Sequence, residues 1–442
     1  MSLRYFPIAI VCSLLVTACG SGSSSSSSRA EPSRPLNDTG ITLCGNYADD
    51  GGSGNHKNDL VCVAVGATRT VAGTDADNDP VPAGQDAVFG RDAQALTGTL
   101  AKTGAGHAGF DFTKLDSNGD ELPASATEWD CVRDNHTGLI WEIKTDGGLR
   151  DKDHTYSWYN SDASSNGGDA GNAHSGSCSG GTGCDTEKYV ADVNAIRLCG
   201  YSDWRMPTRN ELLNIVHNDR VYPALDLDYF PDTQSSNYWS SSTHAENNSY
   251  AWVIQFGSSD VTILPKTGNR RVRLVYGNAS DSQSNNVSCA NENSSINATT
   301  PTADFTDHGD GTVTHDTTGL MWMQCSLGQS GADCATGSAD YHNWLQAHEA
   351  AQDANDGEGT LGYNDWRLPN KNELASIVEE RCWDSATNGD IFPSTPPAWF
   401  WSSSPHASGG DRAWPVDFSD GDLSSSILKG SVFRVRLVRD AY

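Results

Sequence analysis

The chain has few basic residues for its length. Its 442 residues hold 29 Lys and Arg against 57 Asp and Glu, which gives a formal net charge of −28. Nucleic acids and anionic lipid surfaces attract basic patches, so this composition argues against both as partners. Abundant acidic and small polar residues are instead typical of a loop-rich surface that stays dispersed in solution.

Long hydrophobic runs are also scarce. The apolar run from Phe6 to Val16 follows Arg4 and falls short of the ~20 residues that a membrane-spanning helix needs, so it predicts a secretory signal over residues 1–18. The run ends in Leu15-Val-Thr-Ala-Cys19, which resembles the bacterial lipobox, in which the cysteine is lipidated. The alternative is an ordinary secreted protein that is cut after Ala18 and keeps Cys19 free.

Residues 19–40 are predicted to form a tether, because the serine tract that follows Cys19 cannot bury enough apolar surface to fold. These features predict an outer-membrane lipoprotein of a bacterial cell envelope, either periplasmic or surface-exposed. The lipid would be its only contact with the membrane.

The cysteines lack the spacing of a zinc site. There is no Cys-x-x-Cys pair, and an exported chain with ten cysteines besides Cys12 and Cys19 is expected to form disulfides. Proximity favours three pairs; of the remaining four cysteines, one pair could staple repeat one and the other could tie the inter-repeat linker to repeat two. The candidate pairs are Cys44 with Cys62, Cys178 with Cys184, Cys325 with Cys334, Cys131 with Cys199, and Cys289 with Cys382.

The chain contains the same series of motifs twice. Thr137-Gly-Leu-Ile-Trp141, Gly200-Tyr-Ser-Asp-Trp-Arg-Met-Pro207, Trp239-Ser-Ser-Ser242 and Arg271-Val-Arg-Leu-Val275 recur as Thr318-Gly-Leu-Met-Trp322, Gly362-Tyr-Asn-Asp-Trp-Arg-Leu-Pro369, Trp401-Ser-Ser-Ser404 and Arg434-Val-Arg-Leu-Val438. A unit of this length predicts two domains that each have a core of their own.

The predicted boundaries follow from these motifs. Repeat one covers residues 126–277, a polar linker covers 278–300, and repeat two covers 301–442. Residues 41–125 are predicted to be an N-terminal extension that packs onto repeat one.

Each repeat is predicted to hold two helices and several short strands. The first helices lie near residues 187–196 and 344–355, and the second begin at capping boxes formed by Thr208 with Glu211 and by Asn370 with Glu373. Short β-branched and aromatic runs after the second helix predict an antiparallel meander. Because they close capping boxes, Glu211 and Glu373 are expected to be structural residues. Glutamine can also close a capping box, so Glu373→Gln should cost little stability.

Both series resemble the Lcl C-terminal family, named after the C-terminal domain of a bacterial collagen-like adhesin. The Trp-Arg-x-Pro-x-x-x-Glu element also resembles formylglycine-generating-enzyme-like domains, which have the C-type-lectin-like fold. The resemblance implies an α+β protein with two tandem C-type-lectin-like domains, stapled by disulfides. The residues of this chain that form the Trp-Arg-x-Pro-x-x-x-Glu element are Trp204, Arg205, Glu211, Trp366, Arg367 and Glu373, and the resemblance implies a structural role for them.

The family resemblance implies binding rather than catalysis. The namesake adhesin binds sulfated glycans, but this chain is acidic and lacks the Glu-Pro-Asn and Gln-Pro-Asp tripeptides of calcium-dependent lectins. Formylglycine-generating enzymes use paired cysteines in a copper-binding site, where this chain has serines. Ser242, His244 and Asp203 could be combined into the catalytic triad of a hydrolase. The sequence has no Gly-x-Ser-x-Gly elbow to support this hypothesis.

We therefore predict a lipid-anchored binding or adhesion module of the cell envelope whose ligand is a carbohydrate or a protein. The alternative is a non-catalytic structural envelope lipoprotein, and the third hypothesis is an enzyme related to the formylglycine-generating enzymes.

Calcium is the one cofactor that the sequence suggests. Two acidic segments resemble fragments of an EF-hand loop, although Pro80 stands where such a loop needs glycine, and solvated turns explain both segments as well. The candidate ligands are Asp75, Asp77, Asp79, Asp86, Asp116 and Asp120.

Overall fold

The computed structural model describes residues 35–48, 56–179, 183–277, 285–407, 409–424 and 427–441. Residues 32–442 belong to one compact unit. The predicted signal and Cys19 lie outside the described residues. Within the described ranges, no helix has the length and apolar character to cross a membrane.

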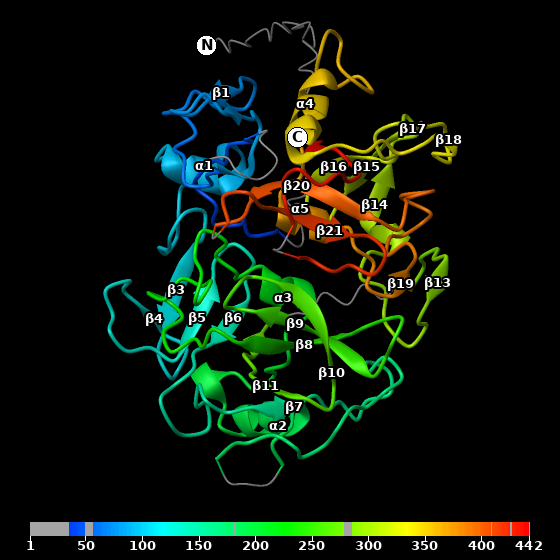
Figure 1. The fold of residues 1–442 in the computed structure, drawn as a ribbon. Coiled ribbons are helices and arrows are strands. Elements are labelled where there is room, and N and C mark those ends of the chain that lie inside the picture. Colours follow the sequence, from blue (N-terminus) through cyan, green and yellow to red (C-terminus); the bar gives the residue numbers. More distant parts are fainter. Residues whose placement is uncertain are drawn as a thin grey trace, which may run out of the picture. The chain divides into compact units, whose positions relative to one another are not determined.

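Repeat one is built around a five-stranded antiparallel sheet in the order β12-β6-β5-β3-β4. A three-stranded meander and two helices complete it (Figure 1). The sheet strands are β3 (Phe112–Leu115), β4 (Glu121–Leu122), β5 (Cys131–Asp134), β6 (Ile140–Glu142) and β12 (Val275–Tyr276). The meander consists of β8 (Asn237–Thr243), β9 (Tyr250–Gln255) and β10 (Val261–Pro265). A separate pair is formed by β7 (Tyr156–Ser157) and β11 (Asn269–Arg270). The helices are α2 (Thr186–Ala195) and α3 (Arg209–Leu213).

Repeat two has the same plan with a four-stranded antiparallel sheet in the order β14-β15-β16-β22. In each repeat the last strand pairs with the strand that holds the Leu-x-Trp motif, which closes the domain. The sheet strands are β14 (Phe305–Asp307), β15 (Thr312–His315), β16 (Leu320–Met323) and β22 (Val438–Asp440). The other elements are the pairs β20 (Trp399–Pro405) with β21 (Ala413–Asp417), β17 (Gln329–Ser330) with β18 (Thr336–Gly337), and β13 (Asn291–Glu292) with β19 (Cys382–Trp383), and the helices α4 (Trp344–Asp353) and α5 (Lys371–Ala375).

These elements confirm the α+β class. The finer C-type-lectin-like assignment stays a prediction.

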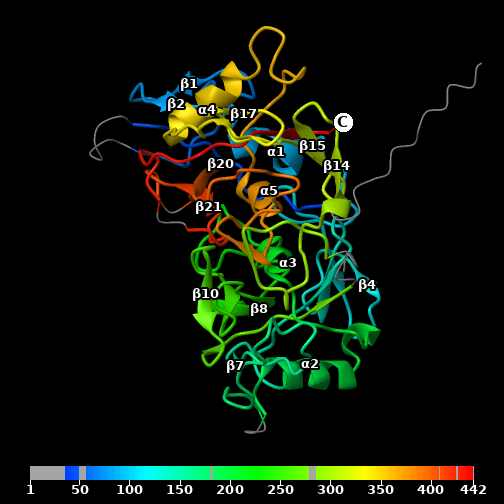
Figure 2. The ribbon, with the colours of Figure 1, turned by 90° about the vertical axis from the view of Figure 1, so that its right-hand side faces the viewer.

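The N-terminal extension is shared between the two repeats. Its elements β1 (Gly73–Thr74), β2 (Pro80–Val81), the 3-10 helix η1 (Asp86–Val88) and α1 (Gly90–Leu96) precede β3 and β4, which complete the sheet of repeat one. The helix η1 instead contacts β20 of repeat two, and both views show α1 beside that repeat (Figures 1 and 2). The expectation that the extension packs onto repeat one therefore holds for only part of it.

The N-terminal extension also begins earlier than predicted, because the described residues from 35 onward, inside the predicted tether, belong to the compact unit. Asn37 and Thr39, which the sequence assigns to residues 19–40, are 1% and 0% exposed. Their hydrogen bonds to buried side chains keep this stretch inside the unit: Asn37 Nδ2 donates to Asp134, and Thr39 Oγ1 donates to Asp86 Oδ2 at 2.8 Å.

The prediction of two separate cores is wrong in one respect. Each repeat has a hydrophobic cluster of its own, but the largest cluster contains residues of both repeats. Leu212 and Val216 of repeat one and Leu374 and Val378 of repeat two all belong to it. Helices α3 and α5 contact each other and lie side by side in both views (Figures 1 and 2). The apolar faces that follow the two capping boxes are therefore buried against each other.

Five disulfides join the described cysteines in the pairs that the sequence favours. They are Cys44–Cys62, Cys131–Cys199, Cys178–Cys184, Cys289–Cys382 and Cys325–Cys334. The Cys289–Cys382 disulfide links the inter-repeat linker to β19 of repeat two. Next to it in the linker, β13 pairs with β19, where Glu292 and Cys382 are register partners.

Candidate functional site

Two equivalent turns, one in each repeat, position the motif side chains. Trp204 and Trp366 are 2% and 3% exposed, and each indole Nε1 donates to a carbonyl of the preceding loop, at 3.1 Å to Leu198 and 2.8 Å to Thr360. A large ring anchored in this way fixes the point at which the chain enters the second helix.

The capping boxes form as the sequence predicts. In repeat one the Thr208 side chain accepts from Glu211 N at 3.2 Å, and Glu211 accepts from Thr208 N at 2.9 Å. In repeat two the bonds between Asn370 and Glu373 are both 2.8 Å. The residues that begin the second helices are therefore held by their own sequence neighbours.

Each capping glutamate also forms a two-pronged ion pair with the motif arginine. Arg205 donates to both carboxylate oxygens of Glu211 at 2.7 Å, and Arg367 donates to both of Glu373 at 2.7 Å. Burial alone would lower the pKa of the Arg367 guanidinium, but Glu373 raises it above its ordinary value. These charges hold the domain together and are not free to act on a ligand.

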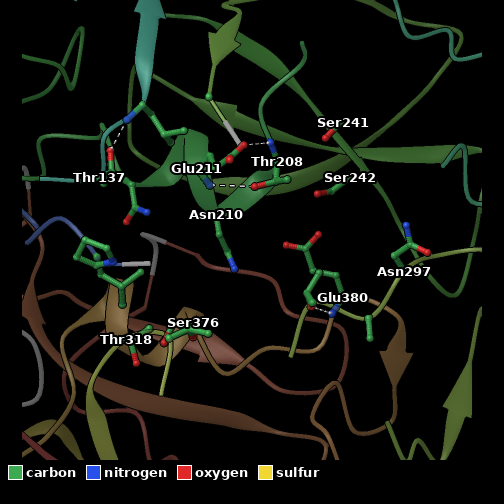
Figure 3. A pocket seen from close by; sticks show the side chains of 18 of the residues that line it. Thr137, Thr208, Asn210, Glu211, Ser241, Ser242, Asn297, Thr318, Ser376 and Glu380 are labelled. Carbon is green, nitrogen blue, oxygen red and sulfur yellow. Dashed lines mark hydrogen bonds between the residues drawn. The ribbon is translucent and has the colours of Figure 1, made fainter. Parts of the chain in front are cut away.

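A cleft of about 810 Å³ opens between the two repeats (Figure 3). Its volume lies in the range of roughly 300–1,000 Å³ that ligand sites occupy. The wall from repeat one consists of Thr137, Gly138, Leu139, Ser165, Thr208, Asn210, Glu211, Asn214, Ser241, Ser242, Thr243 and Gly277. The facing wall consists of Pro35, Leu36, Ile296, Asn297, Ala298, Thr299, His315, Thr317, Thr318, Ser376 and Glu380.

The charged groups of the cleft are already paired, whereas several of its neutral groups have unused hydrogen-bonding capacity. Glu380 lies 3.7 Å from the guanidinium of Arg209, and Glu211 is held by Arg205. Asn210 extends its side chain into the cleft (Figure 3), and its Oδ1 has no hydrogen-bond partner among the described residues. The groups that remain available to a ligand in this cleft are therefore neutral hydroxyls and amides.

Sequence reasoning did not identify Asn210, Asn297 or Glu380 as site residues. The first stands inside the capping box and could be singled out only as a polar residue between two structural ones. The other two belong to repeat two and its linker, and they reach the cleft only because the repeats pack together.

A second, smaller cavity of about 200 Å³ lies at the equivalent place in repeat two. Asp38, Asp86, Phe89 and Arg91 of the N-terminal extension line it together with residues of the second repeat's motifs. Those residues are Thr318, Leu320, Arg367, Asn370, Glu373 and Ser403. The extension therefore covers in repeat two the surface that stays open in repeat one.

Three buried carboxyl groups meet beside this second cavity. Asp38, Asp86 and Asp92 are 8%, 2% and 0% exposed, and one oxygen of each lies within 4.8 Å of the others. Burial raises the pKa of Asp38 to about 6, and burial together with the neighbouring carboxyls raises the pKa of Asp86 and Asp92 well above the ordinary range. Burial and mutual repulsion therefore disfavour the ionisation of all three carboxyl groups at once.

The calcium candidates do not converge in the structure. Lys57 Nζ lies 3.0 Å from Asp75 and 2.6 Å from Asp77, so an ammonium group already bridges the two carboxylates. Asp79 N donates to Asp75, and Asp120 N donates to Asp116, as in ordinary polar turns. Asp86 lies apart from them in the cluster with Asp38 and Asp92.

The members of the hypothetical hydrolase triad have other partners. Ser242 Oγ accepts from Arg209 N at 3.1 Å, as a serine near a helix start commonly does. His244 Nε2 lies 3.8 Å from Asp420, and its Nδ1 accepts from Asn247 N at 3.2 Å. Asp203 is exposed.

The family model of the Lcl C-terminal domain matches residues 130–276 and 311–439. The chain belongs to this family. The two matched segments fall within the two repeats, so each repeat is one Lcl C-terminal domain, called domain one and domain two below. Among curated proteins no significant match is found.

Proposed function

We propose that the protein is a non-catalytic binding module of the bacterial cell envelope, anchored through Cys19, and that its ligand binds in the cleft between the two domains. The observation that supports this proposal is the chemistry of the cleft. Its carboxylates are paired with arginines, while Asn210 and the hydroxyls of Thr208 and Ser242 remain as neutral groups around a space of about 810 Å³. Such groups can orient a ligand without activating it.

The binding hypothesis is tested with the compact unit, residues 32–442, on arrays of glycans and peptides. We expect at least one saturable ligand whose binding is lost in Asn210→Ala. The side chain of Asn210 makes no hydrogen bond that the structure shows, so this variant should keep the melting temperature of the parent. A matched control is Asn297→Ala on the opposite wall, which tests whether the ligand spans the cleft.

The structural alternative makes a different prediction for the same experiment. A protein that only supports the envelope would bind no array component, and no added compound would raise its melting temperature, because only ligands of the native state do so. Turnover of a substrate that depends on Asn210 or Ser242 would instead favour the enzyme hypothesis.

A further inference from the structure

We propose that the cleft of domain one binds a protein segment that presents an aspartate or glutamate side chain, in the way that domain two holds the N-terminal extension of its own chain. This inference rests on the proposed function and names the class of its ligand. It follows from a comparison of two equivalent surfaces, one covered and one open.

The two surfaces are built from matching residues. Thr208, Asn210 and Ser242 of domain one correspond by motif position to Asn370, Asn372 and Ser404 of domain two. The match extends to main-chain contacts, because Ser242 Oγ accepts from Arg209 N at 3.1 Å and Ser404 Oγ accepts from Lys371 N at 3.0 Å. The Arg205–Glu211 and Arg367–Glu373 pairs lie beside them with the same distances of 2.7 Å.

In domain two all three of these side chains donate to the N-terminal extension. Asn370 Nδ2 donates to the carboxyl of Asp38 at 3.0 Å, and Asn372 Nδ2 donates to the main-chain carbonyl of Asn37 at 3.2 Å. Ser404 donates to the carboxyl of Asp86. Domain two therefore recognises carboxyl side chains and a main-chain carbonyl, which together describe a polypeptide.

An aromatic ring completes this contact. Phe89, three residues after Asp86, lies with its ring centre 5.0 Å from the guanidinium carbon of Arg367. A guanidinium over an aromatic face is a favourable contact, and it leaves the edge of Arg367 free to hold Glu373. The segment that domain two binds thus presents a carboxyl group followed by a ring.

The corresponding donors of domain one face the open cleft. Thr208, Asn210 and Ser242 are partly exposed, whereas Asn372 and Ser404 are 3% and 0% exposed beneath the extension. Within the described ranges, the hydroxyl of Ser242 has no acceptor of the kind that Asp86 provides to Ser404. Figure 3 shows Asn210 and Ser242 on the same wall of this space.

The charges of the cleft permit such a ligand. Domain two accepts Asp38 and Asp86 next to an Arg–Glu pair of the same geometry, where burial and the neighbouring Glu373 raise the pKa of both carboxyls. The pair of Arg205 with Glu211 therefore does not exclude a carboxyl group in its neutral form. Thr208 is shorter than Asn370, so the contact that depends on Asn370 in domain two should be weaker here. The interactions of Asn210 and Ser242 should therefore dominate.

The probe is an amidated, fluorescein-labelled peptide with the sequence of residues 84–90, Gly-Gln-Asp-Ala-Val-Phe-Gly, which contains the carboxyl group and the ring. It is titrated into residues 32–442, and fluorescence anisotropy reports binding. We expect one saturable site, because the extension occupies domain two at a high effective concentration. Asp86→Ala in the peptide should weaken binding at least about tenfold, since the acceptor of the hydroxyl bond is lost.

Variants of the protein locate the site. Ser242→Ala, which removes the counterpart of the Ser404 hydroxyl that donates to Asp86, should weaken peptide binding at least about tenfold. The double variant Asn210→Ala/Ser242→Ala should show at least the same loss. The matched control is Asn372→Ala in domain two, which should lower the melting temperature and retain the peptide site.

The possible results separate this inference from the proposed function. If the peptide fails to bind while a glycan binds and is lost in Asn210→Ala, the polypeptide inference is overturned and the cleft remains a binding site. If the peptide binds equally well to the Asn210→Ala/Ser242→Ala protein, the assignment to domain one is wrong. If neither a peptide nor a glycan depends on Asn210 or Ser242, both proposals fail.

Discussion

At the scale of single residues, Glu373 has a larger structural role than its capping box requires. One carboxylate oxygen accepts from Asn370 N, and both oxygens accept from Arg367, whose side chain is 6% exposed. A glutamine could still close the capping box, but it would leave a buried guanidinium with Asp440, which is 68% exposed, as its remaining carboxylate. The sequence-based expectation of a nearly silent substitution therefore changes.

We predict that Glu373→Gln lowers the free energy of unfolding by about 1–3 kcal/mol, because removing one partner of a buried ion pair leaves the other charge uncompensated. Chemical denaturation of residues 32–442 measures it. The matched control is Glu211→Gln in domain one, where Arg205 is 23% exposed and water can replace part of the lost interaction, so the loss should be smaller. Equal and negligible losses at both sites would mean that the capping bond alone matters.

Asp86 provides a second test at this scale. Its pKa is raised in the folded protein, so the folded state binds more protons than the unfolded chain above pH 4. The stability that the protonated form provides is therefore lost as the pH rises from the ordinary value of 3.8 through the folded value. Asp86→Asn keeps an acceptor for the hydroxyls of Thr39 and Ser404 and removes the titration.

We predict that the melting temperature of Asp86→Asn, relative to the parent, increases as the pH rises above about 4 and through the raised pKa of Asp86. The underlying change is up to about 1.4 kcal/mol for each pH unit over which the proton is linked to folding. Asp116→Asn is the control, since the pKa of Asp116 is lowered by the amides of its own turn. Parallel pH curves for Asp86→Asn and the parent would show that the carboxyl of Asp86 is ionised throughout this range.

The anchor prediction also concerns one residue. Replacing Cys19 by Ser removes the thiol that the lipobox-like run predicts to be lipidated. We expect the variant to move from the membrane fraction to the soluble fraction of cells while residues 32–442 keep their melting temperature. Continued membrane attachment of the Cys19→Ser protein would contradict the lipoprotein hypothesis.

At the scale of elements, helices α3 and α5 bring the two domains together at equivalent positions. Arg209 begins α3 with its guanidinium carbon 4.7 Å from the ring centre of Trp252, and Lys371 begins α5 with its Nζ 3.6 Å from that of Trp414. Each basic side chain also contacts the other domain. Arg209 forms an ion pair with Glu380 at 3.7 Å, and Lys371 Nζ donates to Asn218 Oδ1 at 2.7 Å. A buried cation at each helix start therefore specifies how the domains pair.

Burial lowers the pKa of Lys371 to about 7, so the folded state holds fewer protons on this amine than the unfolded chain between pH 7 and pH 10.5. The parent should accordingly gain stability as the pH rises through this window. We predict that Lys371→Met shows a smaller gain in melting temperature from pH 7 to pH 10 than the parent does. A variant with the full gain of the parent would mean that Lys371 keeps its ordinary pKa.

At the scale of the whole molecule, the duplicated domains form one unit because part of the hydrophobic core is common to both. Cutting the chain between them would expose apolar residues of α3 and α5 and of the segments that follow these helices, including Leu212, Val216, Leu374 and Val378. Burial of apolar surface stabilises by about 25 cal/mol per Å², so neither half should keep the stability of the whole.

We predict that residues 32–277, which keep β3 and β4, and residues 301–442, expressed separately in an oxidising compartment, melt at clearly lower temperatures than residues 32–442 or self-associate. Mixing the two should yield a one-to-one complex, which sedimentation can detect. Two monomeric halves that melt cooperatively near the temperature of the intact unit would show that the shared cluster contributes little.

The sequence by itself determined the features that depend on neighbouring residues. The capping boxes at Thr208 and Asn370 form between residues three apart, and the Cys178–Cys184 and Cys325–Cys334 bonds close short loops. The repeated motifs indicated the family. The α+β class was also predictable, because the alternation of polar and apolar residues specifies helices and strands locally.

Only the tertiary structure decided which surfaces meet. Asp38 and Asp86 are separated by 48 positions in the sequence and from Ser404 by more than 300, yet packing places their carboxyl groups on matching donors of domain two. The same packing leaves Asn210 and Ser242 of domain one facing an open cleft. No local pattern distinguishes the covered copy from the open one, because the difference arises from where a distant segment buries its polar and apolar groups.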